Sequence, residues 1–239
     1  MTNDAGDRRP QAALFDLDGT LVDTNYLHTL TWWQALHQHG HQVAMAEIHR
    51  AVGMGADKLL DRLLGEARDR RQDEDLRSAH HTLYATWFDA LPVLDGAADL
   101  LRSVSARGMR IVLASSASAA EVAAIRSALD ADEVITAATS ADDVDATKPA
   151  PDLVEQALAR AGAEPEEAVF IGDTVWDVKA AARAGVPCIG LLTGGVSQAE
   201  LTEAGPVTVY RSPKELLRSI DTSPLAGAVR APGTEVSHA

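Results

Sequence analysis

One acidic strand end decides the fold: Leu14-Phe15-Asp16-Leu17-Asp18-Gly19-Thr20-Leu21-Val22-Asp23-Thr24. Side chains two residues apart in a strand point to the same side, so we expect Asp16 and Asp18 to lie together. Two like charges at the end of an apolar strand repel each other unless a cation or a proton offsets the repulsion. A magnesium ion, or a proton shared between an acid and a base, would do so. The alternative is an ordinary solvated Asp-Gly turn. The full string is much rarer than Asp-Gly alone, which favours a chemical role for the two acids.

The composition indicates a chain with a sizeable core and little affinity for large anionic partners. Its 239 residues are 46% apolar but only 4% aromatic, so alanine, valine and leucine must fill most of the interior. The formal net charge of -14 opposes binding to nucleic acid or to an anionic membrane, although a local cationic patch can still bind phosphate. A single cysteine, Cys188, excludes an internal disulfide, and no apolar run is long enough for a membrane span. With a polar N-terminus unlike a secretory signal, these features favour a cytoplasmic location.

Beyond residue 92 the pattern predicts an α/β fold with a doubly wound, Rossmann-like parallel sheet. Short continuous apolar runs, typical of strands covered on both faces, alternate there with helical stretches. After a first strand at residues 11–16, the predicted strands are residues 110–114, 133–137, 168–171, 187–192 and 207–210. The helices predicted among them are residues 97–107, 119–129, 151–161, 175–184 and 213–219.

The segment between the first strand and residue 92 shows helical spacing and no strand signal. Because the first strand must join the later ones in a single sheet, this segment is predicted to be an all-helical insertion. We therefore predict an α/β core of residues 11–22 and 92–221, and a helical cap domain of residues 23–91. Residues 1–10 and 222–239 are predicted to be disordered termini.

Polar side chains follow two further predicted strands, at the edge where such sheets bind ligands. Ser115 and Ser116 follow one of them, although Ser116 or Ser118 could simply cap the next helix. Asp173 and Asp177 follow another, and the alternative is Asp173 as a helix cap with Asp177 in solvent.

Lys148 lies in the stiff loop Lys148-Pro149-Ala150-Pro151, just before a predicted helix. Proline holds the residue before it in extended backbone, and Pro151 suits the first turn of a helix. The loop is therefore expected to aim the lysine, and the alternative is a lysine exposed to solvent.

These four sites, in this order, resemble the four signatures of the haloacid dehalogenase-like superfamily of phosphotransferases. The resemblance extends from about residue 12 to residue 218, and the helical insertion is similar to the C1-type cap of that family. Phosphoglycolate phosphatases and beta-phosphoglucomutases are the relatives with this arrangement.

The resemblance implies roles for the acidic residues. Asp16 would be the nucleophile that takes up a phosphoryl group, and Asp18 would be the general acid and base, protonated when it donates. Mg²⁺ would be bound by Asp16, by the backbone carbonyl of Asp18 and by Asp173. Asp177 would hold a metal-bound water or orient the lysine. Because dehalogenases of the superfamily replace the second acid, Asp18 favours phosphoryl transfer over carbon–halogen cleavage.

The resemblance also implies a phosphate-binding set. The hydroxyl of Ser115 and the backbone N–H of Ser116 would bind the phosphoryl group. Lys148 would neutralise the nucleophile and the phosphoryl oxygens.

The cap should select the substrate, through a glycine-rich loop at residues 53–58. Arg50 and Lys58 are the candidate substrate contacts, with ordinary surface charges as the alternative. Trp32 and Trp33 are expected in the core of the cap, with stacking on the substrate as the alternative. His28 is expected to be a surface histidine, although its place early in the first cap helix could also face the site.

The sequence therefore predicts a magnesium-dependent phosphatase that hydrolyses a small phosphorylated metabolite through an aspartyl-phosphate. Phosphoglycolate, a hexose phosphate and a nucleotide monophosphate all remain open as substrates, and no oligomeric state is predicted. A sugar-phosphate mutase is the first alternative, although such mutases often carry glutamate where this chain has Gly172. The others are a phosphonate hydrolase with a Schiff base on Lys58, and a non-catalytic binding protein.

Overall fold

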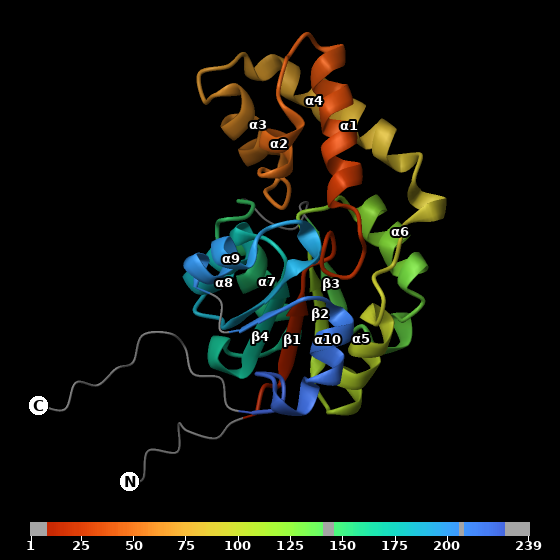
Figure 1. The fold of residues 1–239 in the computed structure, drawn as a ribbon, viewed down its shortest axis with the longest axis vertical. Coiled ribbons are helices and arrows are strands. Elements are labelled where there is room, and N and C mark those ends of the chain that lie inside the picture. Colours follow the sequence, from red (N-terminus) through yellow and green to blue (C-terminus); the bar gives the residue numbers. More distant parts are fainter. Residues whose placement is uncertain (1–8, 141–145, 206–207, 228–239) are drawn as a thin grey trace, which may run out of the picture.

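The computed structural model describes residues 9–140, 146–205 and 208–227. Within these ranges all the strands form one parallel sheet of order β3-β2-β1-β4-β5-β6 (Figure 1). The strands are β1 Ala12–Phe15, β2 Arg110–Ala114, β3 Ala137–Thr139, β4 Ala168–Gly172, β5 Cys188–Leu191 and β6 Thr208–Tyr210. The predicted doubly wound α/β fold is confirmed.

The acidic strand β1 lies at the centre of the sheet, with all of its residues buried. It pairs with β2 on one side and β4 on the other, so that Leu14 aligns with both Val112 and Phe170. The strand order reverses between β1 and β4. In open parallel sheets the ligand crevice lies outside the carboxyl ends of the strands at such a reversal. Asp16 follows β1 directly and therefore lies at that point.

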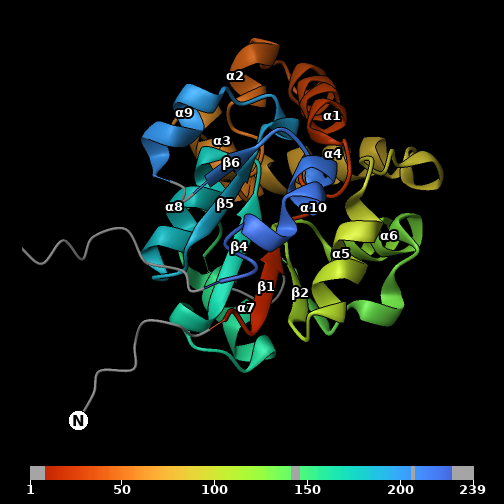
Figure 2. The same ribbon diagram turned by 60° about the horizontal axis from the view of Figure 1, so that its bottom comes forward.

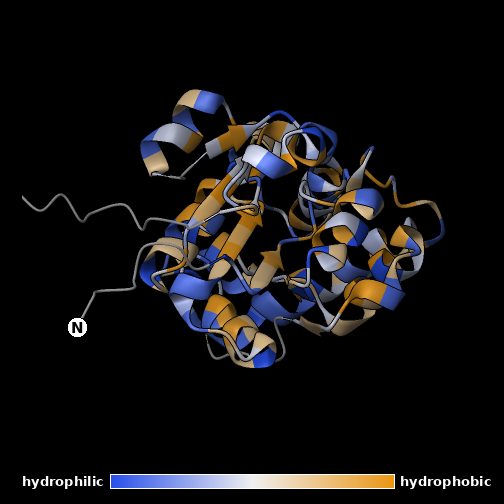
Figure 3. Ribbon diagram, turned by 90° about the horizontal axis from the view of Figure 1, so that it is seen from below, coloured by the Kyte–Doolittle hydropathy of each residue, from blue (hydrophilic) through white to orange (hydrophobic). Residues whose placement is uncertain are grey.

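Helices cover both faces of the sheet (Figure 2). On one face α5, α6 and α10 pack in a cluster that includes Leu100, Ile125 and Leu216. On the other face α7, α8 and α9 pack in a second cluster. These helices are α5 Ala97–Ala106, α6 Ala119–Leu129, α7 Asp152–Ala161, α8 Val175–Arg183, α9 Gln198–Ala204 and α10 Pro213–Arg218. Figure 3 shows the strands as mainly hydrophobic, whereas the surrounding helices combine hydrophobic and hydrophilic residues.

The helices between β1 and α5 lie above the carboxyl ends of the strands (Figure 1). They are α1 Asn25–Gln38, α2 Met45–His49, α3 Ala56–Leu64 and α4 Asp73–Ala85. They share a hydrophobic cluster of their own, which includes Trp32, Ile48 and Leu76. The two chain segments that link these helices to the sheet pair with each other: the N–H of Asp23 donates to the carbonyl of Pro92 at 2.8 Å. The division into core and cap domains at residues 22 and 92 stays a prediction.

The third strand differs from the prediction. Residues 133–137 were expected to be extended, but Asp132–Val134 form a 3₁₀ turn and the strand is Ala137–Thr139. The charged Glu133 suits a surface turn better than a buried strand, and it pairs with Arg102 at 2.8 Å. Helix α9 was not predicted, although its capping box of Ser197 and Glu200 is a sequence signal for a helix start.

The C-terminal segment also differs where it is described. Residues 222–239 were expected to be disordered, but Ser223 and Leu225 are buried, and Leu225 packs against the α5 and α10 side of the sheet. Leu225 is the apolar side chain through which this segment packs on the core. Residues 1–8 and 228–239 lie outside the described residues. None of the described helices has the length and apolar character that crossing a membrane would require.

Two valine substitutions, one inside the sheet and one outside it, test the packing of the sheet. Val112 is fully buried in β2, whereas Val93 is 38% exposed in the linking segment. Val112→Ala removes two buried carbon groups and leaves a cavity, so we expect a loss of about 2–3 kcal/mol in unfolding free energy. Val93→Ala should change it by no more than about 0.5 kcal/mol. Urea denaturation of both variants measures this, and equal losses would contradict the packing.

Candidate active site

A buried lysine holds the centre of the site together. The Nζ of Lys148 lies 2.6 Å from Oδ1 of Asp16 and 2.8 Å from Oδ1 of Asp177, and the lysine side chain is only 1% exposed. The loop thus aims the lysine at the strand end, as the sequence predicted. Burial alone lowers the pKa of Lys148, but the two carboxylates outweigh it and raise the pKa above its ordinary value. The lysine therefore stays charged inside the protein.

The acids that follow β1 and β4 form a single cluster. Asp16, Asp173 and Asp177 are all buried, and one oxygen from each lies within 4.8 Å of the others. Asp173 is fixed by two donors, the hydroxyl of Thr20 at 2.9 Å and Nδ2 of Asn25 at 2.8 Å. A compact set of carboxylate oxygens fits a hard divalent cation such as Mg²⁺.

The protonation of these acids follows from their burial. Burial raises the pKa of Asp16 to about 7, with Lys148 opposing the shift and Asp177 adding to it. Burial, with the charges of Asp177 and Asp16, raises the pKa of Asp173 well above its ordinary value. One lysine therefore does not balance three carboxylates. A cation between them would favour their ionised forms.

The two carboxylate oxygens of Asp177 make different contacts. Its Oδ2 accepts hydrogen bonds from the N–H of Thr174 at 3.0 Å and from the Thr174 hydroxyl at 2.6 Å, which makes a capping box for α8. Its Oδ1 faces Lys148. The sequence alternative of Asp173 as the cap is therefore wrong, because Thr174 is the cap, and Asp177 is not solvated.

Asp18 pairs with residues of α1 and not with the acid cluster. Its Oδ1 accepts a hydrogen bond from the Thr24 hydroxyl at 2.5 Å and lies 3.1 Å from Nε2 of His28. Burial raises the pKa of Asp18, but His28 and Thr24 outweigh burial and bring the pKa below its ordinary value. Burial lowers the pKa of His28, but Asp18 outweighs it and raises that pKa. These opposite pKa shifts favour the proton on the histidine. The expectation that Asp18 is protonated when it donates to a leaving group stays a prediction.

A second imidazole ring extends this chain of contacts. Nδ1 of His28 lies 3.2 Å from Nε2 of His80 in α4. Burial, together with the nearby His28 and His81, brings the pKa of His80 well below its ordinary value. A neutral His80 can accept the hydrogen bond that a protonated His28 donates. Sequence reasoning missed both histidines, since His28 was expected on the surface.

The end of β2 presents hydroxyls beside the acids, as predicted. Ser115 is buried, and its Oγ accepts a hydrogen bond from the N–H of Ala117 at 3.0 Å, which leaves its own proton free to donate. The Oγ of Ser116 is buried with no hydrogen-bond partner in the described structure. Ser118, not Ser116, caps α6.

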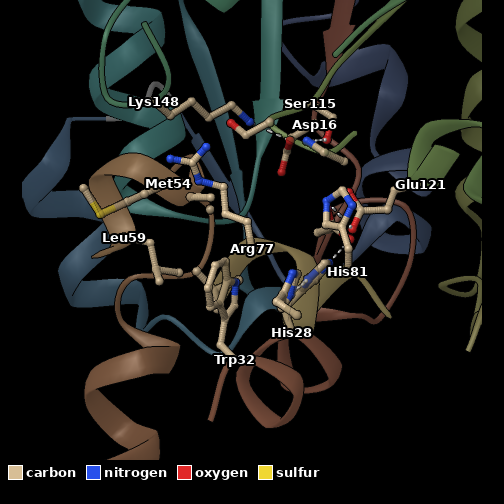
Figure 4. A pocket seen from close by; sticks show the side chains of 17 residues that line it. Asp16, His28, Trp32, Met54, Leu59, Arg77, His81, Ser115, Glu121 and Lys148 are labelled. Atoms are coloured by element: carbon tan, nitrogen blue, oxygen red, sulfur yellow. Dashed lines mark hydrogen bonds and ion pairs between the residues drawn. The ribbon is translucent and has the colours of Figure 1, made fainter. Parts of the chain in front are cut away.

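Most of these groups line one cavity of about 100 Å³ between the sheet and the helices above it (Figure 4), whereas Asp173 and Asp177 are not among its lining residues. Its polar walls combine residues after β1 and β2, the loop before α7, and helices α1, α4 and α6. They are Asp16, Asp18, Ser115, Ser116, Lys148, His28, Arg77, His80, His81 and Glu121. Trp32, expected as cap core, packs in the cap cluster and lines this cavity as well. Sequence reasoning missed Arg77 and His81, whose four-residue spacing on a helix was the available signal.

The structure does not bring the two predicted cap cations into this cavity. Arg50 points elsewhere and pairs with Glu200 at 2.7 Å. Lys58 lies 3.8 Å from both Asp57 and Asp61 and is 44% exposed. The loop beside them does reach the core, since the hydroxyl of Thr147 donates to Asp57 at 2.8 Å.

A glycine makes room for Asp173, which provides a test of the cluster. A Cβ added at Gly194 would overlap Oδ2 of Asp173, whereas one at Gly227 would meet nothing within 4 Å. We expect Gly194→Ala to displace Asp173 and weaken Mg²⁺-dependent thermal stabilisation by at least about tenfold in metal affinity. Gly227→Ala is the control. Equal Mg²⁺ titration midpoints for both variants would show that Asp173 does not bind the metal.

The Asp18–His28 pair predicts a pH-dependent stability. The lowered pKa of Asp18 stabilises the fold above its ordinary 3.8, and this is lost as pH falls through the folded value. The raised pKa of His28 stabilises the fold below its ordinary 6.5, and this is lost as pH rises through the folded value. In metal-free buffer, His28→Gln should therefore cost about 1.5–3 kcal/mol near pH 5.5 and less near pH 9.

The control is His37→Gln, which changes an exposed histidine of the same helix. Denaturant unfolding at both pH values gives the comparison. A His28→Gln deficit of the same size at both pH values would mean that the charge of His28 does not matter.

The comparisons with known proteins agree with this geometry. The haloacid dehalogenase-like hydrolase family matches residues 10–185. Phosphoglycolate phosphatase of Escherichia coli (strain K12) is 28% identical over 228 residues, which cover 86% of this chain and 90% of that protein. A hydrolase from Pseudomonas syringae has a TM-score of 0.84 and 33% identity, covering 89% of this chain and 98% of that one.

CbbY from Rhodobacter sphaeroides, solved in complex with phosphate, has a TM-score of 0.72 and 26% identity, covering 87% of this chain and 96% of that one. The family match takes in β1, β2 and β4 with the acids and serines that follow them. It therefore confirms the resemblance first suggested by the acidic strand end. This chain is an enzyme of the haloacid dehalogenase-like hydrolase family.

Proposed function

We propose that the chain hydrolyses the phosphate monoester of a small metabolite, with Mg²⁺, through an aspartyl-phosphate formed on Asp16. The observation that carries this proposal is the buried contact of Lys148 with Asp16 and Asp177, next to Asp173. The phosphatase name of the Escherichia coli relative supports it. Residues 23–91 would act as the cap that closes over the substrate.

Asp16 is placed to attack phosphorus, because it lies at the carboxyl end of β1 and lines the cavity. An anionic nucleophile and an anionic phosphate repel each other, and Lys148 reduces that repulsion from 2.6 Å away. The bond that forms joins an Asp16 oxygen to phosphorus, and the bond that breaks releases the alcohol oxygen of the substrate. Hydrolysis then returns Asp16 to its free form.

Asp16, Asp173 and the backbone carbonyl of Asp18 would hold Mg²⁺, and Asp177 would stay with Lys148. The ion supplies positive charge that stabilises the phosphoryl oxygens as charge builds on them. The chain itself provides the fixed orientation, since Thr20 and Asn25 hold Asp173 in place.

The leaving alcohol needs a proton, and the Asp18–His28 pair carries one. His28 would pass its proton to Asp18, which would donate it to the departing oxygen. Asp18 would then accept a proton from the water that opens the aspartyl-phosphate. A general acid and base of this kind contributes about 10²–10⁴-fold to the rate. Ser115 and Ser116 would donate to the phosphoryl group, because their hydroxyls lie at the end of β2 in the same cavity.

The close packing at Gly172 favours a hydrolase over a sugar-phosphate mutase. A Cβ at position 172 would lie 2.5 Å from Cβ of Asp177, so no glutamate fits there while Asp177 contacts Lys148.

A phosphate-release screen over small phosphate monoesters tests the proposal. We expect release with Mg²⁺ and none after EDTA treatment. Asp16→Asn should lower kcat by at least about 10³-fold on the best substrate, because it removes the nucleophile. Asp89→Asn, at an exposed acid, is the matched control.

Acid-quenched wild type should also carry one added phosphoryl group on the peptide that contains Asp16. Full turnover by Asp16→Asn, or activity that survives EDTA, would overturn the proposal.

A further inference from the structure

The charged groups around the cavity are matched in pairs, with one exception. Lys148 faces Asp16, and His28 faces Asp18. His81 lies 3.8 Å from Glu121, across the boundary between α4 and α6. Each of these three side chains has a carboxylate of the cavity wall beside it.

Arg77 is the exception among the lining residues that the structure describes. Its Nε is buried and has no hydrogen-bond partner. Its only ion pair there is with Glu74, at 3.6 Å from Nη1, and the Glu74 side chain is 84% exposed. Such a loose surface pair contributes little. The Arg77 side chain is 41% exposed, but its Nε is a buried donor, and a buried donor without an acceptor is costly. An acceptor on a bound ligand would remove that cost.

The position of Arg77 suits a ligand group distant from the reacting phosphate. In Figure 4 its side chain extends from α4 toward the part of the cavity where Lys148 and Asp16 lie. Asp16, Lys148 and Ser115 belong to the core, whereas Arg77 belongs to the opposite wall. A substrate with its phosphoryl group on the core would therefore present its other end to Arg77.

We infer that Arg77 binds a second anionic group on the substrate, a carboxylate or a second phosphate. A guanidinium is suited to this, because its planar set of N–H donors matches both groups in a bidentate way. The substrate class is then a short phosphate monoester with an anion at its far end. This inference rests on the proposed function, since the same cavity holds the reacting phosphate.

The size of the cavity limits the length of this substrate. Its volume of about 100 Å³ corresponds to about seven to ten water-sized positions. A phosphoryl group with its bridging oxygen takes five of them. The remainder suits a carbon or two and a carboxylate, whereas a second phosphate would need more than this volume.

Matched substrates and variants test the inference. 2-Phosphoglycolate carries a carboxylate where 2-hydroxyethyl phosphate carries a neutral hydroxymethyl group. Ethylene glycol bisphosphate distinguishes a second phosphate from the carboxylate. Arg77→Gln should lower kcat/KM for the anionic esters by about 10–100-fold and for 2-hydroxyethyl phosphate by less than about threefold. The control is Arg62→Gln, since Arg62 is a cap arginine that lies over Trp176 and does not line this cavity.

Calorimetric binding separates this inference from the proposed chemistry. Asp16→Asn protein, with and without Arg77→Gln, is titrated with the same esters. Tighter binding of an anionic ester that disappears with Arg77→Gln supports the role of Arg77 even if no ester is hydrolysed. Equal losses on the anionic and neutral esters, or no loss on either, would overturn it.

Discussion

Everything at this site depends on the balance of charge around a lysine that water does not reach. Lys148 contacts Asp16 and Asp177, and Asp173 lies within the same small volume. Buried like charges would push these loops apart if nothing opposed them. The sheet forces the acids together, because β1 and β4 are neighbours and both end there. Lys148, and the cation that the cluster would hold, offset the repulsion between these carboxylates.

The role proposed for each site residue follows from the strand or helix on which it lies. The ends of β1, β2 and β4 provide Asp16, Ser115 and Asp173, whose positions are fixed by the hydrogen bonding of the sheet. The helices above provide His28 and Arg77, whose positions depend on how those helices pack on the core. Groups that contact the reacting atoms thus lie on the rigid layer. Of the two residues from the helices, His28 would supply a proton in the proposed mechanism, and Arg77 would bind the far end of the substrate.

Much of the core could be predicted from the sequence, because it is encoded locally. The apolar run before Asp16 and the strand before Asp173 both lie where the pattern placed them. Charged residues misled the prediction at residues 133–137, where a surface turn replaced an expected strand. Strand ends indicated Asp16, Asp18, Ser115 and Asp173, and the proline loop before a helix indicated Lys148. The positions of those side chains agree with the prediction, while their chemical roles await experiment.

The cap side of the site could not be predicted in the same way. Packing between helices that are far apart in sequence decides which face of α1 or α4 is turned toward the sheet. His28 was therefore placed on the surface, although it reaches Asp18. Arg50 and Lys58 were favoured because their loop is glycine-rich, yet Arg50 pairs with Glu200 outside the cavity. Arg77 was overlooked because its one local signal, the four-residue spacing from His81, does not show which way that face of α4 points.

The shared carboxylate of Asp177 has a consequence for how the enzyme becomes competent. One of its oxygens starts α8 and the other holds the lysine, so a single side chain ties helix nucleation to the charge state of the nucleophile. Unwinding of the first turn of α8 would remove one of the two carboxylates that hold Lys148, the other being Asp16. A molecule with this turn unwound would therefore position its lysine less firmly. Fraying of one helical turn, far short of global unfolding, would be enough to have this effect.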